Sequence, residues 1–180
     1  MMHDDVKYVM LTEEQIDKRV RELAAELDEY YLGKNPLVVC ILKGSTLFFT
    51  DLIRRMQTKL SIDFMRVSSY GSGFVSSGVV ALEKDLTVDI KGRDVLIVED
   101  IMDSGNTLFK LKEVLGSREP NDIKIVTLLD KPCRRTAPIQ PDYRGFEIED
   151  EFVVGYGLDY IEMYRNLPYV GVLKPSVYEK

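Results

Sequence analysis

At residues 95–107 the chain reads Val95-Leu96-Ile97-Val98-Glu99-Asp100-Ile101-Met102-Asp103-Ser104-Gly105-Asn106-Thr107, and this stretch decides its fold. Four apolar, mostly β-branched residues follow the turn Gly92-Arg93-Asp94, and such an unbroken run predicts a strand buried on both faces. Two carboxylates stand at the carboxyl end of this strand, and apolar residues at helical spacing begin at Leu108. The stretch therefore predicts a strand, a loop and a helix in an α/β protein.

The loop at 103–107 has the composition of an anion cradle at a helix N-terminus. Unpaired N–H groups and the positive end of the helix dipole hold a phosphate there, and the hydroxyls of Ser104 and Thr107 add donors. Gly105 lets the backbone approach a ligand. Glu99 and Asp100 would repel a bare phosphate, so a sugar phosphate whose hydroxyls reach these acids fits better. Neither a Walker loop nor the G-x-G-x-x-G fingerprint follows the strand.

The whole stretch resembles the motif with which type I phosphoribosyltransferases bind phosphoribosyl pyrophosphate (PRPP). An ordinary strand-to-helix crossover with an acidic loop is the alternative. Some family members have a lysine where this chain has Asn106, so one positive charge near the phosphate is absent here. The resemblance implies that ribose and its 5-phosphate are bound by Glu99, Asp100, Asp103, Ser104, Gly105, Asn106 and Thr107.

Length and composition limit the possible partners and location. A chain of 180 residues can bury one α/β domain, and a net charge of −6 opposes binding to nucleic acid. The two cysteines favour a reducing compartment, and no apolar run has transmembrane length or the character of a signal peptide. We expect a cytoplasmic protein without a membrane partner. The single histidine, His3, removes histidine-based catalysis from consideration.

The remaining segments alternate between helical and strand patterns. Thr12 and Gln15 form a capping box for a helix that ends near Gly33. Strands are predicted at 37–42, 62–69 and 123–129, and a helix at 46–56. The expected fold is α/β, a mainly parallel twisted sheet flanked by helices with a small hood from the C-terminal segment. By resemblance this is the type I phosphoribosyltransferase fold in a single domain over 1–180, with its core at about 36–130 and its hood from the N-terminal segment and about 131–180.

The loop after strand 37–42 predicts a second anion site. Parallel strands bring their loops to one edge of the sheet, so Lys43 and Gly44 are expected beside the cradle. A plain turn is the alternative. Leu42-Lys43-Gly44-Ser45 is similar to the pyrophosphate loop of purine phosphoribosyltransferases, and the resemblance adds Arg165 as a further pyrophosphate contact.

The stretch Ser69 to Gly78 is rich in glycine and serine. Its composition suits either a mobile loop or a long connector to a strand at 79–82. In the family a loop with a Ser-Tyr pair, matched by Ser69 and Tyr70, folds over the pyrophosphate as a lid and excludes water.

Residues of the last third provide a candidate purine site. Lys131 follows strand 123–129, and the resemblance to purine phosphoribosyltransferases implies that it meets the 6-oxo group of the base. Its N–H donors suit that oxo group but not the amino group of adenine. A solvated surface lysine is the alternative. The segment from Phe146 to Val172 resembles the hypoxanthine-guanine phosphoribosyltransferases more than the orotate or uracil phosphoribosyltransferases. By that resemblance Phe152 stacks on the purine and Val153 meets it through its backbone, although both residues also suit a core. Asp159, with Glu99 and Asp100, would hold Mg²⁺.

Taken together, the resemblance implies transfer of phosphoribose from PRPP to N9 of hypoxanthine or guanine, giving IMP or GMP and pyrophosphate. Asp103 is the candidate general base for the N7 proton, with a helix N-cap as its alternative role. A homodimer or homotetramer is expected by resemblance. The alternatives are a xanthine-preferring enzyme and an RNA-binding regulator that senses PRPP or nucleotides, against which the net charge of −6, Asp103 and Lys131 argue.

Overall fold

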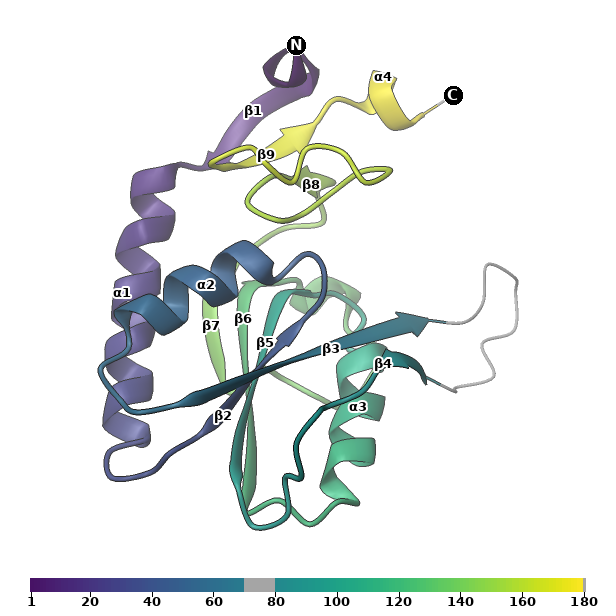
Figure 1. Cartoon of the computed structure of the whole chain (residues 1–180). Coiled ribbons are helices and arrows are strands. Elements are labelled where there is room, and N and C mark those ends of the chain that lie inside the picture. The colour runs from purple at the N-terminus through teal and green to yellow at the C-terminus, as the bar shows by residue number, and fades with distance from the viewer. Residues whose placement is uncertain (70–79, 180) are drawn as a thin grey trace.

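The computed structural model describes residues 1–69 and 80–179, and its centre is a six-stranded sheet of order β4-β3-β2-β5-β6-β7 (Figure 1). Strands β2, β3, β5, β6 and β7 are parallel, and β4 is antiparallel to β3. The strands are β2 (Leu37–Ile41), β3 (Ser61–Ser69), β4 (Val80–Lys84), β5 (Asp94–Met102), β6 (Asp122–Asp130) and β7 (Tyr143–Glu147).

Helices cover both faces of this sheet. The helices α1 (Glu13–Tyr30) and α2 (Thr46–Arg55) lie on one face, and α3 (Asn106–Gly116) lies on the other (Figure 1). A short 3₁₀ helix, η2 (Pro132–Arg134), follows β6. The predicted α/β fold with a mainly parallel sheet is confirmed. Among the residues that the structure describes, no helix combines the length and apolarity needed to cross a bilayer.

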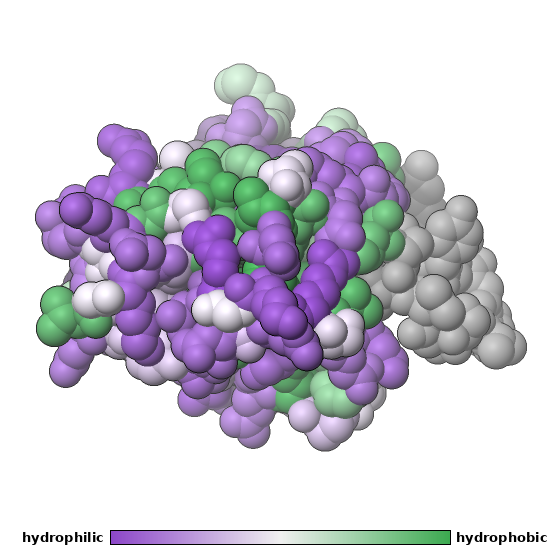
Figure 2. Space-filling view, turned by 60° about the horizontal axis from the view of Figure 1, so that its bottom comes forward, coloured by the Kyte–Doolittle hydropathy of each residue, from purple (hydrophilic) through white to green (hydrophobic). Residues whose placement is uncertain are grey.

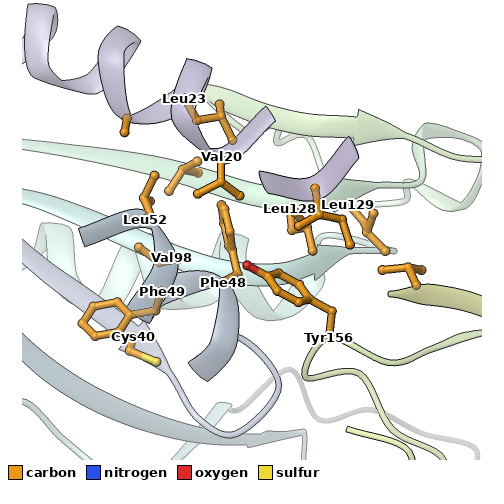
Figure 3. Packing of buried hydrophobic residues seen from close by; sticks show 14 of the residues in the cluster. Val20, Leu23, Cys40, Phe48, Phe49, Leu52, Val98, Leu128, Leu129 and Tyr156 are labelled. Carbon is orange, nitrogen blue, oxygen red and sulfur yellow. The ribbon is translucent and has the colours of Figure 1, made fainter. Parts of the chain in front are cut away.

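The strands are buried on both faces because alternate residues enter two separate cores. Val38 and Val98 pack with α1 and α2, whereas Val39 and Ile97 pack with α3. Figure 3 shows the first core, where side chains of α1, α2, β5 and β6 meet together with Tyr156. Polar residues cover most of the face drawn in Figure 2, with hydrophobic residues between them. The unbroken apolar runs in the sequence thus reflect two cores rather than one.

The hood is a three-stranded antiparallel sheet of order β1-β9-β8 above the carboxyl edge of the large sheet (Figure 1). It comprises β1 (Val6–Leu11), β8 (Val153–Val154) and β9 (Val170–Leu173), flanked by η1 (Met2–Asp5) and α4 (Pro175–Tyr178). The predicted hood is therefore present. The division into a core at 36–130 and a hood stays a prediction; α1 and β7, from outside 36–130, pack on or join the large sheet.

Strand β5 is longer than its apolar run. It continues through Glu99 and Asp100 to Met102, because Glu99 is still paired with Thr127 of β6 and Met102 with Asp130. The acids therefore belong to the strand rather than following it. The lid prediction falls mostly on residues outside the described part: Ser69 ends β3, and Tyr70 lies in the undescribed range 70–79.

Helix α1 begins with the predicted capping box. The Gln15 amide donates to Thr12 Oγ1 over 3.3 Å, and the Thr12 amide donates to Gln15 Oε1 over 2.8 Å. The five apolar residues predicted on one face of this helix are all buried, namely Ile16, Val20, Leu23, Ala24 and Leu27. Local sequence therefore determines both the start and the orientation of α1.

We predict that Thr12→Ala lowers the free energy of unfolding by ~1 kcal/mol, because it removes the hydroxyl that caps α1. Thr12→Ser keeps that hydroxyl and is the matched control, expected to stay close to the parent. Urea denaturation followed by circular dichroism measures both. Equal losses for the two variants would show that the cap contributes nothing.

Candidate active site

A cavity of about 320 Å³ lies at the carboxyl ends of β2 and β5. The loop after β2, the end of β5, the loop before α3 and the hood all contribute to its wall. It brings together most residues predicted for PRPP, namely Lys43, Gly44, Glu99, Asp100, Asp103, Ser104, Gly105, Thr107, Asp159 and Arg165. Asn106 is not part of this wall; its side-chain amide donates to Thr136 Oγ1 over 3.1 Å.

Gly105 sets the geometry of the loop before α3. It is the N-cap residue of that helix and has a left-handed φ of +79°. An added Cβ would lie only 2.8 Å from both Arg135 Cδ and Ile139 Cγ2, so both the backbone and the space require glycine. The position of Gly105 also shows that the alternative role of Asp103 as the helix N-cap was wrong.

Asp103 is instead one of the residues that line the cavity. Its Oδ1 atom is buried and has no hydrogen-bond partner among the described residues. Asp103 lines the cavity, and buried polar atoms in folded proteins are nearly always paired. Because Oδ1 is inaccessible to water, a ligand in the cavity would reach it only after the side chain turns.

Glu99 and Asp100 form a crowded acidic pair in the cavity wall. Burial raises the pKa of Glu99 well above its ordinary value, and repulsion from Asp100 raises it further. Burial also raises the pKa of Asp100, against the opposing charge of Arg165. Hydroxyl donors or a cation in the cavity would relieve this repulsion.

The loop after β2 touches this pair directly. The peptide bond between Leu42 and Lys43 is cis. A Cβ added to Gly44 would overlap Asp100 Oδ2, and one added to Gly157 of the hood, at a φ of +101°, would overlap the Gly44 carbonyl oxygen. The Asp100 carboxylate and the backbone of Gly157 thus both lie against Gly44, which explains why the loop cannot accept a side chain there.

The two cations predicted for pyrophosphate are both paired with acids. Lys43 Nζ lies 2.8 Å from Glu162 Oε2, and the hydrogen bond from Lys43 lowers the pKa of Glu162. Arg165 Nη2 lies 2.8 Å from Asp159 Oδ1 and 3.4 Å from Glu162 Oε1. Sequence reasoning did not find Glu162, since no local pattern links it to Lys43.

A second cavity of about 440 Å³ adjoins the first and shares Asp100, Ile101, Asp103 and Asp159 with it. All three residues predicted for the purine line it: Lys131, Phe152 and Val153. Lys131 is buried and donates from Nζ to the Glu151 carbonyl over 2.8 Å, so it is not a solvated surface lysine.

The two hood residues differ in exposure. Phe152 is 38% exposed, so the alternative that it belongs to the core was wrong. Val153 is buried and packs in the core as well as lining the cavity.

Arg135 supports the loop and was missed by the sequence reasoning. Its Nε donates to the Asp103 carbonyl over 2.9 Å, its Nη2 donates to the Met102 carbonyl over 3.2 Å, and it forms an ion pair with buried Asp130. The side chain thus holds two successive carbonyls before Gly105. The only sequence signal was its position four residues after Lys131, which does not reveal burial.

The carboxylates suit a hard divalent cation such as Mg²⁺. Glu99, Asp100 and Asp159 all line the first cavity. Within residues 1–69 and 80–179 no group of three or more metal-ligating side chains is assembled. This arrangement fits Mg²⁺, which commonly binds through one or two carboxylates together with substrate phosphates and water.

Comparison with known proteins gives consistent matches. The family model for the phosphoribosyl transferase domain matches residues 10–161. The hypoxanthine-guanine phosphoribosyltransferase of Bacillus subtilis is 56% identical over 179 residues, with 99% of each chain covered. A crystal structure of a hypoxanthine phosphoribosyltransferase from Staphylococcus aureus superposes with a TM-score of 0.97 at 56% identity, covering 99% of this chain and 97% of that one.

Another relative is longer than this chain. The bifunctional protein TilS/HprT of Listeria innocua is 54% identical over 179 residues, and the chain spans 28% of the length of that relative.

We predict that Gly44→Ala weakens binding of magnesium pyrophosphate ~10- to 100-fold, because the new methyl group displaces Asp100 and the loop. Isothermal titration calorimetry measures this affinity. Gly116→Ala is the matched control, since no atom lies within 4 Å of its added Cβ. The same affinity in Gly44→Ala and the parent would contradict a pyrophosphate site at this loop.

Proposed function

The chain belongs to the phosphoribosyltransferase family, and on that premise we propose that it transfers the 5-phosphoribosyl group of PRPP to N9 of hypoxanthine or guanine in purine salvage. The products are IMP or GMP and pyrophosphate. One observation carries the proposal: a cavity lined by Lys43, Arg165 and the loop before α3 adjoins, at Asp103, a second cavity lined by Phe152 and the buried Lys131. The reacting sugar carbon would lie where the two cavities meet.

We assign PRPP to the first cavity. The 5-phosphate binds to the backbone amides and hydroxyls of residues 103–107 at the start of α3, and the ribose hydroxyls donate to Glu99 and Asp100. Lys43, Gly44 and Arg165 receive the pyrophosphate group. The side-chain amide of Asn106 is turned to Thr136, so its contribution to the phosphate is that of its backbone.

The base occupies the second cavity. Phe152 offers an exposed ring for stacking, and Val153 offers backbone groups. Lys131 Nζ has one bond to the Glu151 carbonyl and further N–H donors for the 6-oxo group. A site that commits a buried donor to an oxo group rejects adenine, since the amino group would leave that donor unpaired.

Asp103 acts as the general base. It lines both cavities, so its carboxylate can accept the N7 proton of the base while N9 attacks C1 of the ribose. Arg135 holds the backbone of Asp103 in place by donating to its carbonyl. Positive charge that develops on the sugar as pyrophosphate leaves is stabilised by the neighbouring carboxylates.

From the acids Glu99, Asp100 and Asp159, one or two carboxylates would hold Mg²⁺ together with the substrate, and the bound cation would supply charge neutralisation for the leaving pyrophosphate. A lid that starts at Ser69 and includes Tyr70, a homodimer or homotetramer, a cytoplasmic location and the absence of nucleic-acid and membrane partners all remain predictions.

We predict turnover on hypoxanthine, guanine or both with PRPP and Mg²⁺, and none on adenine. Asp103→Asn should lower kcat ~10²- to 10⁴-fold with little change in PRPP affinity, because it removes a proton acceptor and keeps the shape of the side chain. A spectrophotometric assay with hypoxanthine, guanine, xanthine and adenine in parallel measures this.

Asp89→Asn on an exposed turn is the control and should match the parent. Full kcat in Asp103→Asn would refute the assigned base. Preference for xanthine would identify the alternative enzyme, and PRPP binding without turnover on any base would identify a sensor.

A further inference from the structure

The ring of Phe152 is held by two other aromatic residues of the hood. Tyr178 stacks on it with ring centroids 4.8 Å apart and an interplanar angle of 19°. Tyr160 meets it edge-on, with centroids 5.6 Å apart and an angle of 86°. These are the two favourable geometries for aromatic pairs, so both contacts orient the ring.

The three residues come from separate segments. Phe152 precedes β8, Tyr160 lies in the loop that follows β8, and Tyr178 is the last residue of α4. The Leu173 amide at the end of β9 donates to the Phe152 carbonyl over 2.8 Å. The short segment between β9 and Tyr178 is therefore anchored beside Phe152.

Tyr160 and Tyr178 are themselves fixed in the hood. Both pack against the buried cluster of Val154, Tyr164, Leu167 and Leu173. Phe152 keeps 38% of its surface exposed and lines the second cavity together with Lys131 and Tyr178. The ring thus rests on the hood through Tyr178 and offers its remaining surface to the cavity.

We infer that Tyr178 is a positioning residue for the purine, which holds the Phe152 ring in the orientation required for stacking on the base. This inference rests on the proposed stacking role of Phe152. A phenylalanine ring without such support rotates between rotamers, and ordering it on binding costs free energy. The segment after β9 thereby contributes to affinity for the base through Phe152.

The experiment compares KM for hypoxanthine with KM for PRPP in four variants. Tyr178→Ala should raise KM for hypoxanthine ~2- to 10-fold, the range expected for loss of one aromatic pair, and leave KM for PRPP within ~2-fold. Tyr178→Phe keeps the ring and should restore the parent value. Tyr169→Ala is the matched control, because Tyr169 packs against the same hood cluster and forms no aromatic pair with Phe152.

Phe152→Ala separates the stacking role of Phe152 from the positioning role of Tyr178. If it leaves KM for hypoxanthine unchanged, the stacking role of Phe152 fails and this inference fails with it. If Phe152→Ala raises that KM and Tyr178→Ala does not, only the role of Tyr178 is refuted. A lower KM in Tyr178→Ala would also refute it, since Tyr178 would then occupy the space of the base. Titration of IMP gives the same comparison without turnover.

Discussion

The site depends on the burial of two adjacent carboxylates, Glu99 and Asp100. They lie near the carboxyl end of β5, where this strand is still paired with β6. Burial raises the pKa of both carboxyl groups, and repulsion from Asp100 raises the pKa of Glu99 further. The strand holds them in place because pairing with β6 continues beyond them to Met102. Pairing of β5 with β2 ends at Val98, one residue before the acids, so both neighbouring strands restrain this part of β5. The sheet therefore imposes an arrangement that the two side chains would not adopt by themselves.

The hood is coupled to this arrangement by close backbone contact. Gly157 lies against the Gly44 carbonyl, and Gly44 lies against Asp100. Arg165 adds a charge contact, because it pairs with Asp159 and lowers the pKa of Asp100. Because the hood contacts the loop after β2 through two closely packed glycines, it has little room to move relative to the large sheet. The two cavities therefore keep fixed positions relative to each other.

Features that depend on neighbouring residues were predictable from the sequence, and features that depend on distant contacts were not. The capping box of α1 and the strand, loop and helix around Gly105 follow from residues a few positions apart. By contrast, Arg135 reaches the Asp103 carbonyl over 32 positions, and Lys43 pairs with Glu162 over 119 positions. The sequence pattern also did not decide whether Lys131 is a solvated surface residue or part of the purine site, because the burial of a lysine depends on the fold around it.

From the charge balance of the first cavity we expect the proposed substrate to bind together with a cation. Four carboxylates line it, from Glu99, Asp100, Asp103 and Asp159, against the two cationic groups of Lys43 and Arg165. Both cations already have acidic partners, so pyrophosphate in the proposed site would exchange existing ion pairs for new ones. Such an exchange yields less affinity than binding to an unpaired cation. Neutralisation of the pyrophosphate charge by Mg²⁺ would favour binding. The four carboxylates of the cavity would in turn favour departure of the polyanionic product.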